Sequence, residues 1–453
     1  MNEMNSNTFL LEKRLYFRKT KTKTKKKTKS KTKSKTKTKT KTYISEYFII
    51  PFILLIFFFI SYLLYHYYKD IKIDKFYNNS KIDKYNNMSI DDNAYLEHVF
   101  NYINLNINGS LINNIKTFKK IKNPKISIVI TVKDAQGCIK SAVRSIQNQD
   151  FNDIEIIILD DYSEDESVKI IKELMIEDPR IVLLQNSENK GILYSKTKGV
   201  LNAKGKYVMT LDVDDLYAVD YAFSFLYREA EKNNLDIVGY TSMQGEIFDD
   251  GFHKKNFHDD IETPIIYQPE LSEKSYHKNN NGDIIGVRDI LWCYFFRTDL
   301  FIKTINEIDK KFLNTKNYEC DDIFVFYLLV KRAKSYKHFK RVIYATVHRT
   351  NLNNPLNNFF HKRKYEIRKK NNCMGYLSYI EFVLLKSDDN FKDKKIASFA
   401  IKKFFLNTEC KNKMSIREQA IEVCNLYLKN PFIEDNVKKD INSFLNDVNQ
   451  GTN

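Results

Sequence analysis

The segment Leu211-Asp212-Val213-Asp214-Asp215 places three carboxylates within four positions, directly after the apolar run 207–211. A buried strand that ends in this way points negative charge out of the edge of a sheet. That arrangement is unfavourable without a partner, and a hard divalent cation with oxygen ligands is the natural one. We therefore expect Mg²⁺ or Mn²⁺ here, held by one or two carboxylates with places left for phosphate oxygens. The alternative is an acidic cap, in which Asp214 or Asp215 caps a turn at Leu216.

The segments upstream of this motif predict a sheet that would carry it. Apolar, β-branched runs typical of buried strands cover residues 125–132, 154–159, 181–184 and 207–211. Helical patterns lie between them, at 139–149, around 168–175 and after 189–191. Strands without polar alternation, separated by helices, predict a parallel sheet covered on both faces. Ligands of such sheets bind at the carboxyl ends of the strands, which is where the acidic and glycine-containing segments fall.

Residues 126–220 resemble the nucleotide-sugar half of a family 2 glycosyltransferase, whose fold is called GT-A. The matching segments, in family order, are Ser127–Asp134, Ser145–Gln149, Leu159–Ser163, Asn189–Gly199 and Leu211–Asp215. They correspond to the first strand and turn, the end of the first helix, the Asp-Asp-Gly-Ser turn, the Asn-x-Gly helix and the Asp-x-Asp-Asp metal motif. The resemblance implies an α/β domain with a Rossmann-like, mostly parallel sheet and flanking helices.

The resemblance also implies roles for the acidic residues at the strand ends. Asp161 would accept a hydrogen bond from the nucleotide base, and Asp212 would meet the ribose. Asp214 would ligate Mn²⁺ or Mg²⁺ that bridges the diphosphate of a nucleotide-diphosphate sugar. The family pattern therefore predicts a donor site in which carboxylates bind both ends of the nucleotide.

Three further residues would bind the substrate by the same resemblance. Thr131 and Asp134 stand at the end of the first strand, where Thr131 replaces the proline that is usual in the family. Lys196 replaces the usual arginine, so it keeps the positive charge for the diphosphate but loses the bidentate fork. The alternative for Lys196 is a solvated lysine on the surface of a helix.

The second half of the domain must supply a base for the acceptor. Glu319-Cys320-Asp321-Asp322 precedes the apolar helical segment 323–330 and is similar to the Glu-Asp motif of the family. This similarity implies that Asp322 is the catalytic base, since a carboxylate within hydrogen-bond reach of a sugar hydroxyl can take its proton. The alternative is that Asp321 caps the helix and Asp322 only interacts with the helix dipole.

Two other residues have less decisive patterns. Trp292 is the only tryptophan, and it either stacks on a sugar ring or packs in the core. His348 follows a strand-like segment at 342–347, where it either reaches the metal or the diphosphate or has a structural role. The six cysteines form no Cys-x-x-Cys pair, which argues against a zinc site.

The N-terminal segments predict a membrane anchor. Residues 47–68 carry no Asp, Glu, Lys or Arg, and a helix of this length spans about 33 Å, enough to cross a bilayer core. Residues 1–42 hold 16 Lys and Arg against 2 Glu, a charge of +14, so the whole-chain +17 leaves +3 for the rest. The basic composition thus describes a disordered tail and does not indicate nucleic-acid binding. Dense lysine beside the span predicts a cytoplasmic tail.

These observations predict five regions: a basic cytoplasmic tail (1–46), a transmembrane helix (47–68), a stem (69–122), a GT-A domain (123–355) and a C-terminal helical region (356–453). We expect a single-pass membrane protein of the Golgi or ER with a lumenal catalytic domain. Its predicted activity is metal-dependent, inverting transfer of one sugar from a nucleotide-diphosphate sugar to a glycan or glycoconjugate. The alternatives are a catalytically silent membrane scaffold of the same fold and a cytosol-facing transferase that acts on a lipid phosphate.

Overall fold

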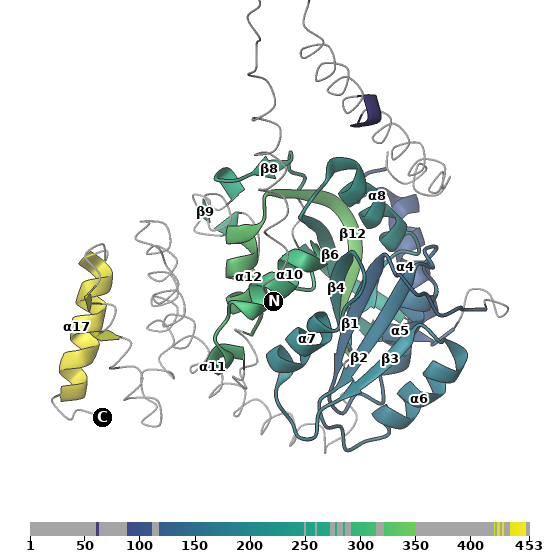
Figure 1. Ribbon diagram of the computed structural model, residues 1–453, viewed down its shortest axis with the longest axis horizontal. Coiled ribbons are helices and arrows are strands. Elements are labelled where there is room, and N and C mark those ends of the chain that lie inside the picture. Colours follow the sequence, from purple (N-terminus) through teal and green to yellow (C-terminus); the bar gives the residue numbers. More distant parts are fainter. Residues whose placement is uncertain are drawn as a thin grey trace, which may run out of the picture. The chain divides into compact units, whose positions relative to one another are not determined.

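The computed structural model describes most of the region between residues 88 and 349 (Figure 1). The described residues are 60–62, 88–110, 117–248, 251–258, 261–271, 277–278, 284–285, 291–313, 321–349, 421, 424–425, 428–429 and 435–449. The chain divides into two compact units, Met1–His66 and Tyr67–Asn453. The fold described below is that of the second unit.

Four parallel strands form one half of the main sheet, in the order β3-β2-β1-β4. They are β1 (Ile126–Val132), β2 (Ile154–Asp160), β3 (Ile181–Gln185) and β4 (Tyr207–Asp212). All seven residues of β1 and of β2 are buried. The predicted parallel sheet is confirmed in this half, with strand ends within one or two residues of those read from the sequence.

Helices cover both faces of the parallel strands, which explains why the strands lack polar alternation. In Figure 1, α7 (Ile192–Leu201) lies on one side, and α5 (Ile139–Gln147) and α6 (Ser167–Glu177) lie on the other. Ile128 of β1 packs in the same core as Val143 of α5, whereas the adjacent Val129 packs with Val200 of α7. Successive side chains of one strand therefore enter two separate cores.

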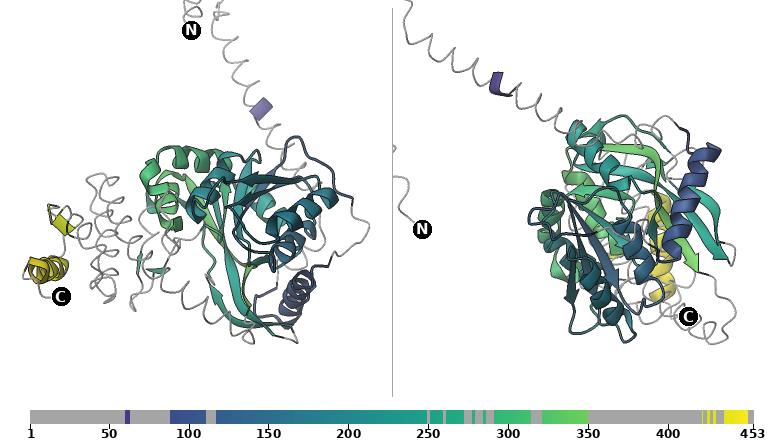
Figure 2. Two further views of the ribbon diagram at one scale, coloured as in Figure 1. Left: turned by 90° about the horizontal axis from the view of Figure 1, so that it is seen from below. Right: turned by 90° about the vertical axis from the view of Figure 1, so that its right-hand side faces the viewer.

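Beyond β4 the sheet is mixed, so the expectation of a mostly parallel sheet is only partly right. The remaining order is β4-β11-β6-β12-β5, in which β11 runs antiparallel to both β4 and β6, and β12 runs parallel to β6. The strands are β5 (Leu216–Tyr217), β6 (Ile237–Phe248), β7 (Gly251–His258), β8 (Ile266–Tyr267), β11 (Tyr294–Arg297) and β12 (Ser335–Arg349). Figure 2 shows the long strands among them curving away from the parallel half. A separate two-stranded sheet pairs β9 (His277–Lys278) with β10 (Ile284–Ile285).

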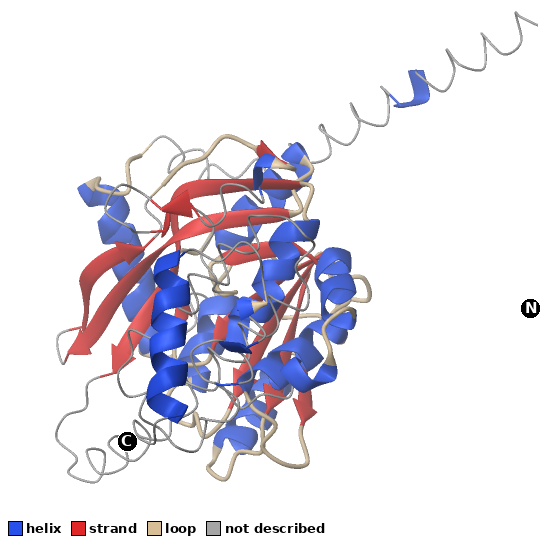
Figure 3. Cartoon of the chain, turned by 90° about the vertical axis from the view of Figure 1, so that its left-hand side faces the viewer, coloured by secondary structure: helices blue, strands red, loops and turns tan. Residues whose placement is uncertain are grey.

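Further helices lie beside the strands of the sheet (Figure 3). They are α8 (Ala222–Asn233), α10 (Thr298–Asn306), α11 (Lys310–Leu313) and α12 (Asp321–Arg332). Within the predicted stem, α4 (Asn93–Ile107) buries five side chains, and its Tyr102 hydroxyl donates to the carbonyl of Ser145 at 2.8 Å. In the predicted C-terminal helical region the described residues include one long helix, α17 (Asp435–Asn449).

Several predicted features lie outside the described residues. They include the basic tail, residues 47–59 and 63–68 of the expected membrane span, and Glu319 and Cys320 of the Glu-Asp motif. Among the residues that the structure does describe, no helix has both the length and the apolar character needed to cross a membrane.

Candidate active site

The carboxyl ends of three parallel strands meet at one edge of the sheet. Thr131, near the end of β1, is in register with Leu159 of β2 on one side and with Asp212 of β4 on the other. Asp161 follows β2 directly, and its backbone N–H donates to the carbonyl of Val132 at 2.8 Å. Thr131, Asp161 and Asp212, which the sequence places in three separate motifs, therefore lie on adjacent strand ends.

Lys196 of α7 joins this edge to the second half of the domain. Its side chain is 3 % exposed, and its Nζ lies 3.0 Å from Asp322 Oδ1 and 3.4 Å from Asp212 Oδ1. The alternative of a solvated helix lysine is thereby wrong, because the buried ammonium of Lys196 bridges two carboxylates from β4 and α12. A buried cation of this kind is stable only when it is paired, and Lys196 is paired on two sides.

Asp322 is held through both carboxylate oxygens. Oδ1 accepts from Lys196 and Oδ2 accepts the backbone N–H of Leu291 at 2.9 Å. The residue is buried in the first turn of α12, which begins at Asp321. The carboxylate therefore has a fixed orientation, and its role as the base stays a prediction.

Gly199 allows helix α7 to pack closely against the sheet, and this close packing brings Lys196 to the strand ends. A Cβ added at Gly199 would lie 2.4 Å from Cγ1 of Val129 on β1. A distance that short is not tolerated by close-packed side chains. Gly199, which the sequence comparison places in the Asn-x-Gly helix motif, thus permits the contact between α7 and β1 that brings Lys196 to the strand ends.

Asp161 organises the turn that leads into α7. One oxygen accepts from Asn186 Nδ2 and from the Lys190 N–H, each at 2.8 Å, and the other accepts the Gly191 N–H at 2.8 Å. A carboxylate has about four acceptor positions, so three protein bonds leave one for a nucleotide base. The structure thus places Asp161 at the strand ends and gives it a structural role, while its contact with a base stays a prediction.

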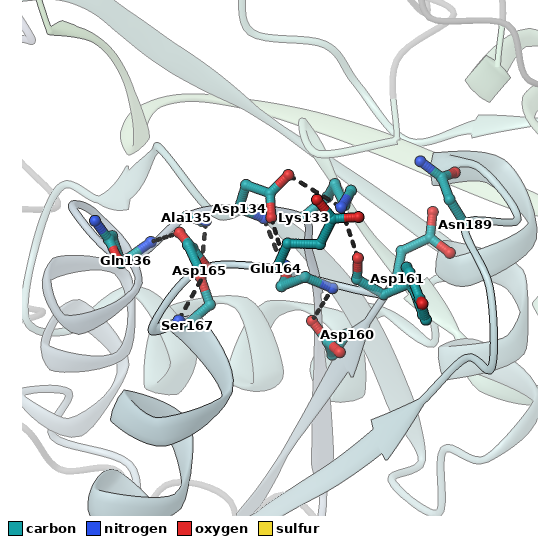
Figure 4. A network of polar contacts seen from close by, with 12 residues as sticks. Lys133, Asp134, Ala135, Gln136, Asp160, Asp161, Glu164, Asp165, Ser167 and Asn189 are labelled. Carbon is teal, nitrogen blue, oxygen red and sulfur yellow. Dashed lines mark hydrogen bonds and ion pairs between the residues drawn. The ribbon is translucent and has the colours of Figure 1, made fainter.

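Asp134 lies in a network of turn contacts (Figure 4). It adopts a left-handed backbone with φ of 52°. Its carboxylate accepts the Glu164 N–H at 2.8 Å and pairs with Lys133 Nζ at 3.0 Å, and its own N–H donates to Ser163 Oγ at 3.0 Å. These hydrogen bonds and this ion pair tie the turn after β1 to the turn after β2.

The metal motif forms a turn whose carboxylates point different ways. The Asp215 N–H donates to the Asp212 carbonyl at 3.0 Å, Asp214 is exposed, and Asp215 is 7 % exposed. Burial, and then the neighbouring carboxylates of Asp214 and Asp212, raise the pKa of Asp215 well above its usual range. Leu216 belongs to strand β5 rather than to a helix turn, so the capping alternative is wrong.

The donor set fits a divalent cation that is shared with a diphosphate. No group of three or more His, Cys, Asp or Glu side chains capable of holding a metal occurs among the described residues. Mg²⁺ needs only one or two protein carboxylates when phosphates and water complete its shell. Asp214 is exposed at the turn, and the buried Oδ1 of Asp212 has no hydrogen bond within the described part of the chain, since its ion pair with Lys196 is long. The exposed carboxylate of Asp214 is therefore the group of this turn that a cation from solvent would reach.

The structure settles what Trp292 and His348 contact. The Trp292 ring stacks on Tyr344, with centroids 4.7 Å apart and planes 22° from parallel. His348 is exposed at the end of β12, and its Nε2 lies 2.8 Å from Nε2 of Gln244. Tyr344 was not singled out from the sequence, and Asp215 was named only as one carboxylate of the motif or as a cap, yet the Tyr344 hydroxyl donates to Asp215 at 2.9 Å. A tyrosine within a strand pattern carries no signal that separates such a role from core packing.

The comparisons with known proteins follow this geometry. Residues 127–300 match the model of Glycosyl transferase family 2, so this segment is similar to that family. The mixed α/β sheet with helices on both faces accords with a GT-A-like fold. The matched segment covers the strand ends, Lys196 and the metal motif, and it ends before Asp322.

Individual relatives cover part of the chain. A curated Bacillus subtilis protein, "Uncharacterized glycosyltransferase EpsJ", is 29 % identical over 185 residues, 39 % of this chain and 49 % of that protein. A "GalNAc(5)-diNAcBac-PP-undecaprenol beta-1,3-glucosyltransferase" of Campylobacter jejuni is 34 % identical over 124 residues, 27 % of this chain and 40 % of that protein. The chain thus spans half or less of these relatives. Among solved structures, S. aureus TarS 1-349 is 14 % identical with a TM-score of 0.48, covering 72 % of this chain and 92 % of that one.

Proposed function

We propose that this chain is a metal-dependent, inverting glycosyltransferase. It would move one sugar from a nucleotide-diphosphate sugar to a hydroxyl of a glycan or glycoconjugate. The observation that carries the proposal is the position of Lys196 between Asp212, at the donor edge of the sheet, and Asp322, in the half that must supply a base. The similarity of residues 127–300 to family 2 supports the same class of reaction.

The proposed transfer is a single displacement at the anomeric carbon. The acceptor hydroxyl oxygen bonds to the anomeric carbon while the bond between that carbon and the diphosphate oxygen breaks. The hydroxyl proton passes to the Asp322 carboxylate. Lys196 and the Leu291 N–H hold that carboxylate in one orientation. Mn²⁺ or Mg²⁺ on Asp214 would supply positive charge to the diphosphate as it departs.

The donor side of the proposal assigns the nucleotide to the strand ends. Asp161 has an acceptor position left for the base, and the partly exposed side chain of Asp212 would meet the ribose. Thr131 lies between them on β1. The location of Asp134, within the turn network of Figure 4, favours a supporting role for it at the rim of this site.

A screen of donor sugars tests the proposal. Full-length protein in detergent is incubated with UDP-, GDP- and other nucleotide sugars, with Mn²⁺, with Mg²⁺ and with EDTA, and nucleotide release is measured. We expect release from one donor class, lost in EDTA and accelerated by the right acceptor. A protein that binds a donor but never releases nucleotide would instead be the silent scaffold of the same fold.

The acceptors tested in the screen distinguish between a hydroxyl of a free or protein-linked oligosaccharide and a hydroxyl of a lipid-linked glycan. The name of the Campylobacter relative describes a glucosyltransferase for a glycan on undecaprenyl diphosphate. Free and protein-linked oligosaccharides are therefore compared with glycans on a polyprenyl diphosphate. Transfer to the lipid-linked glycans alone would favour a lipid-linked acceptor over a glycoprotein.

We also propose that residues 47–68 anchor the chain in a membrane, with the lysine-rich tail in the cytoplasm and the enzyme in the lumen of the Golgi or ER. The support is the uncharged segment itself and the density of lysine before it. Protease added to sealed microsomes should remove only residues 1–46. Digestion of the catalytic domain without detergent would reverse the orientation.

A further inference from the structure

The third carboxylate of the metal motif is engaged by strand β12. Asp215 Oδ1 accepts the backbone N–H of Val347 at 2.9 Å, and Oδ2 accepts the hydroxyl of Tyr344 at 2.9 Å. The residue is buried, whereas Asp214, next to it, is exposed. Asp215 therefore turns away from the surface on which a cation would bind, and its two oxygens are occupied by protein donors.

The Tyr344 hydroxyl contacts both ends of the motif. It donates to Asp215 and accepts the backbone N–H of Asp212 at 3.2 Å. A tyrosine hydroxyl has one proton to donate, and here that proton goes to Asp215. One buried hydroxyl thus fixes the first and the last carboxylate residue of the turn, and Asp214 lies between them.

The ring that carries this hydroxyl is itself held in place. Tyr344 stacks on Trp292, and its edge meets Tyr217, with centroids 6.1 Å apart and planes at 87°. Its strand is paired on both sides, with Tyr217 of β5 and Ser242 of β6 as direct partners of Tyr344. Burial raises the pKa of the Tyr344 hydroxyl well above its usual value, so it keeps the proton that it donates. The hydroxyl cannot shift without moving the sheet.

We infer that Tyr344 is a positioning residue for the metal motif, and that Asp215 is its anchor and not a metal ligand. The inference rests on the proposed function and assigns different roles to the carboxylates of the motif. Asp212 and Asp214 meet the donor and the cation, while Asp215 and Tyr344 set where those two carboxylates lie. Residues that orient metal ligands in this way typically change metal affinity by about 10–100-fold when they are removed.

The first test measures Mn²⁺ binding to full-length Tyr344→Phe, alone and with UDP or GDP. Binding is monitored by electron paramagnetic resonance as the decrease in the signal of free Mn²⁺. We expect a dissociation constant raised by about 10–100-fold. In turnover, excess Mn²⁺ should restore much of kcat, which a general loss of structure would not allow. Tyr217→Phe is the matched control, because its buried hydroxyl has no hydrogen-bond partner among the described residues and belongs to the same aromatic cluster.

Unchanged Mn²⁺ affinity in folded Tyr344→Phe overturns the inference, and so does an equal loss in Tyr217→Phe. If the wild-type protein binds neither Mn²⁺ nor a nucleotide, the proposed function fails instead, so the two failures are distinguishable. A second pair of variants covers the case in which Tyr344→Phe does not fold. Asp215→Asn should weaken Mn²⁺ binding at least tenfold less than Asp214→Asn, since only Asp214 is a ligand. Equal losses would make Asp215 a ligand and overturn the inference.

Discussion

The ammonium of Lys196 lies 3.0 Å from the carboxylate of Asp322, although 126 residues separate them in the chain. The same ammonium lies 3.4 Å from Asp212. One lysine therefore connects the residue proposed to meet the donor with the residue proposed to take the acceptor proton. This relationship links the two halves of the site, and it carries the first prediction.

Replacing Lys196 with Met should leave two carboxylates facing each other without a cation. We expect a loss of about 2–3 kcal/mol in the free energy of unfolding, below the 3–5 kcal/mol of fully buried pairs because Asp212 is partly exposed. Denaturant unfolding of the wild type, Lys196→Met, Asp322→Asn and the double variant measures the coupling. Additive losses would mean that the ion pair contributes nothing. Lys196→Arg should retain more stability than Lys196→Met.

Asp322→Asn should slow transfer while donor binding survives. It removes the proton acceptor, a change worth about two to four orders of magnitude in kcat. Donor binding should survive because Asp161, Asp212 and Asp214, the residues proposed to bind the nucleotide and the metal, are unchanged in this variant. Single-turnover transfer and nucleotide binding are measured for Asp322→Asn and for Asp321→Asn, which should be much less affected. A silent Asp321→Asn beside an active Asp322→Asn would show that the base is the neighbouring residue.

Asp214→Ala should abolish Mn²⁺-dependent donor binding and leave the fold intact. The side chain is exposed at the turn after β4, so its removal costs the core nothing. Calorimetric titration of nucleotide with and without Mn²⁺ checks the binding, and thermal unfolding checks the fold. Glu173→Gln, an exposed carboxylate on α6, is the control for loss of charge. Unaltered Mn²⁺-dependent affinity in Asp214→Ala would refute the metal assignment.

Gly199→Ala should destabilise the domain and impair turnover together. The added methyl would lie 2.4 Å from Cγ1 of Val129, and overpacking of this kind typically costs about 1–3 kcal/mol. Because α7 carries Lys196, displacement of the helix also moves the ammonium away from Asp322. Combining Gly199→Ala with Val129→Ala, which removes the colliding atom, should recover part of both losses. An enzyme insensitive to Gly199→Ala would show that α7 adjusts freely.

Stability should fall in alkaline solution because of buried tyrosines. Burial raises the pKa of Tyr102 and of Tyr240 well above the value of an exposed tyrosine. Above about pH 10 the unfolded chain loses these protons while the folded chain keeps them, so each residue costs up to about 1.4 kcal/mol per pH unit. Urea unfolding at pH 8, 10 and 11 should show this loss. Tyr240→Phe should flatten the slope, whereas Tyr162→Phe, at a half-exposed residue, should not.

The sequence by itself determined the parallel half of the sheet and the residues at its edge. Strands β1 to β4 were readable because each is a short apolar run bounded by polar turns, a pattern that depends on neighbours in the chain. Asp161 and Asp212 were readable for the same reason, since each stands at the end of such a run. Their meeting at one edge then follows from parallel pairing alone.

Only the tertiary structure decided how that edge is completed. The reversal of direction at β11, the pairing of Lys196 with Asp322, and the anchoring of Asp215 by Tyr344 join residues far apart in the sequence. Residues 215 and 344 are 129 positions apart. No local pattern selects such partners, because the free energy of a buried ion pair or hydroxyl contact depends on which groups the packed core brings together. The sequence thus indicated which residues could take part in chemistry, whereas the tertiary packing determined which residues hold them in position.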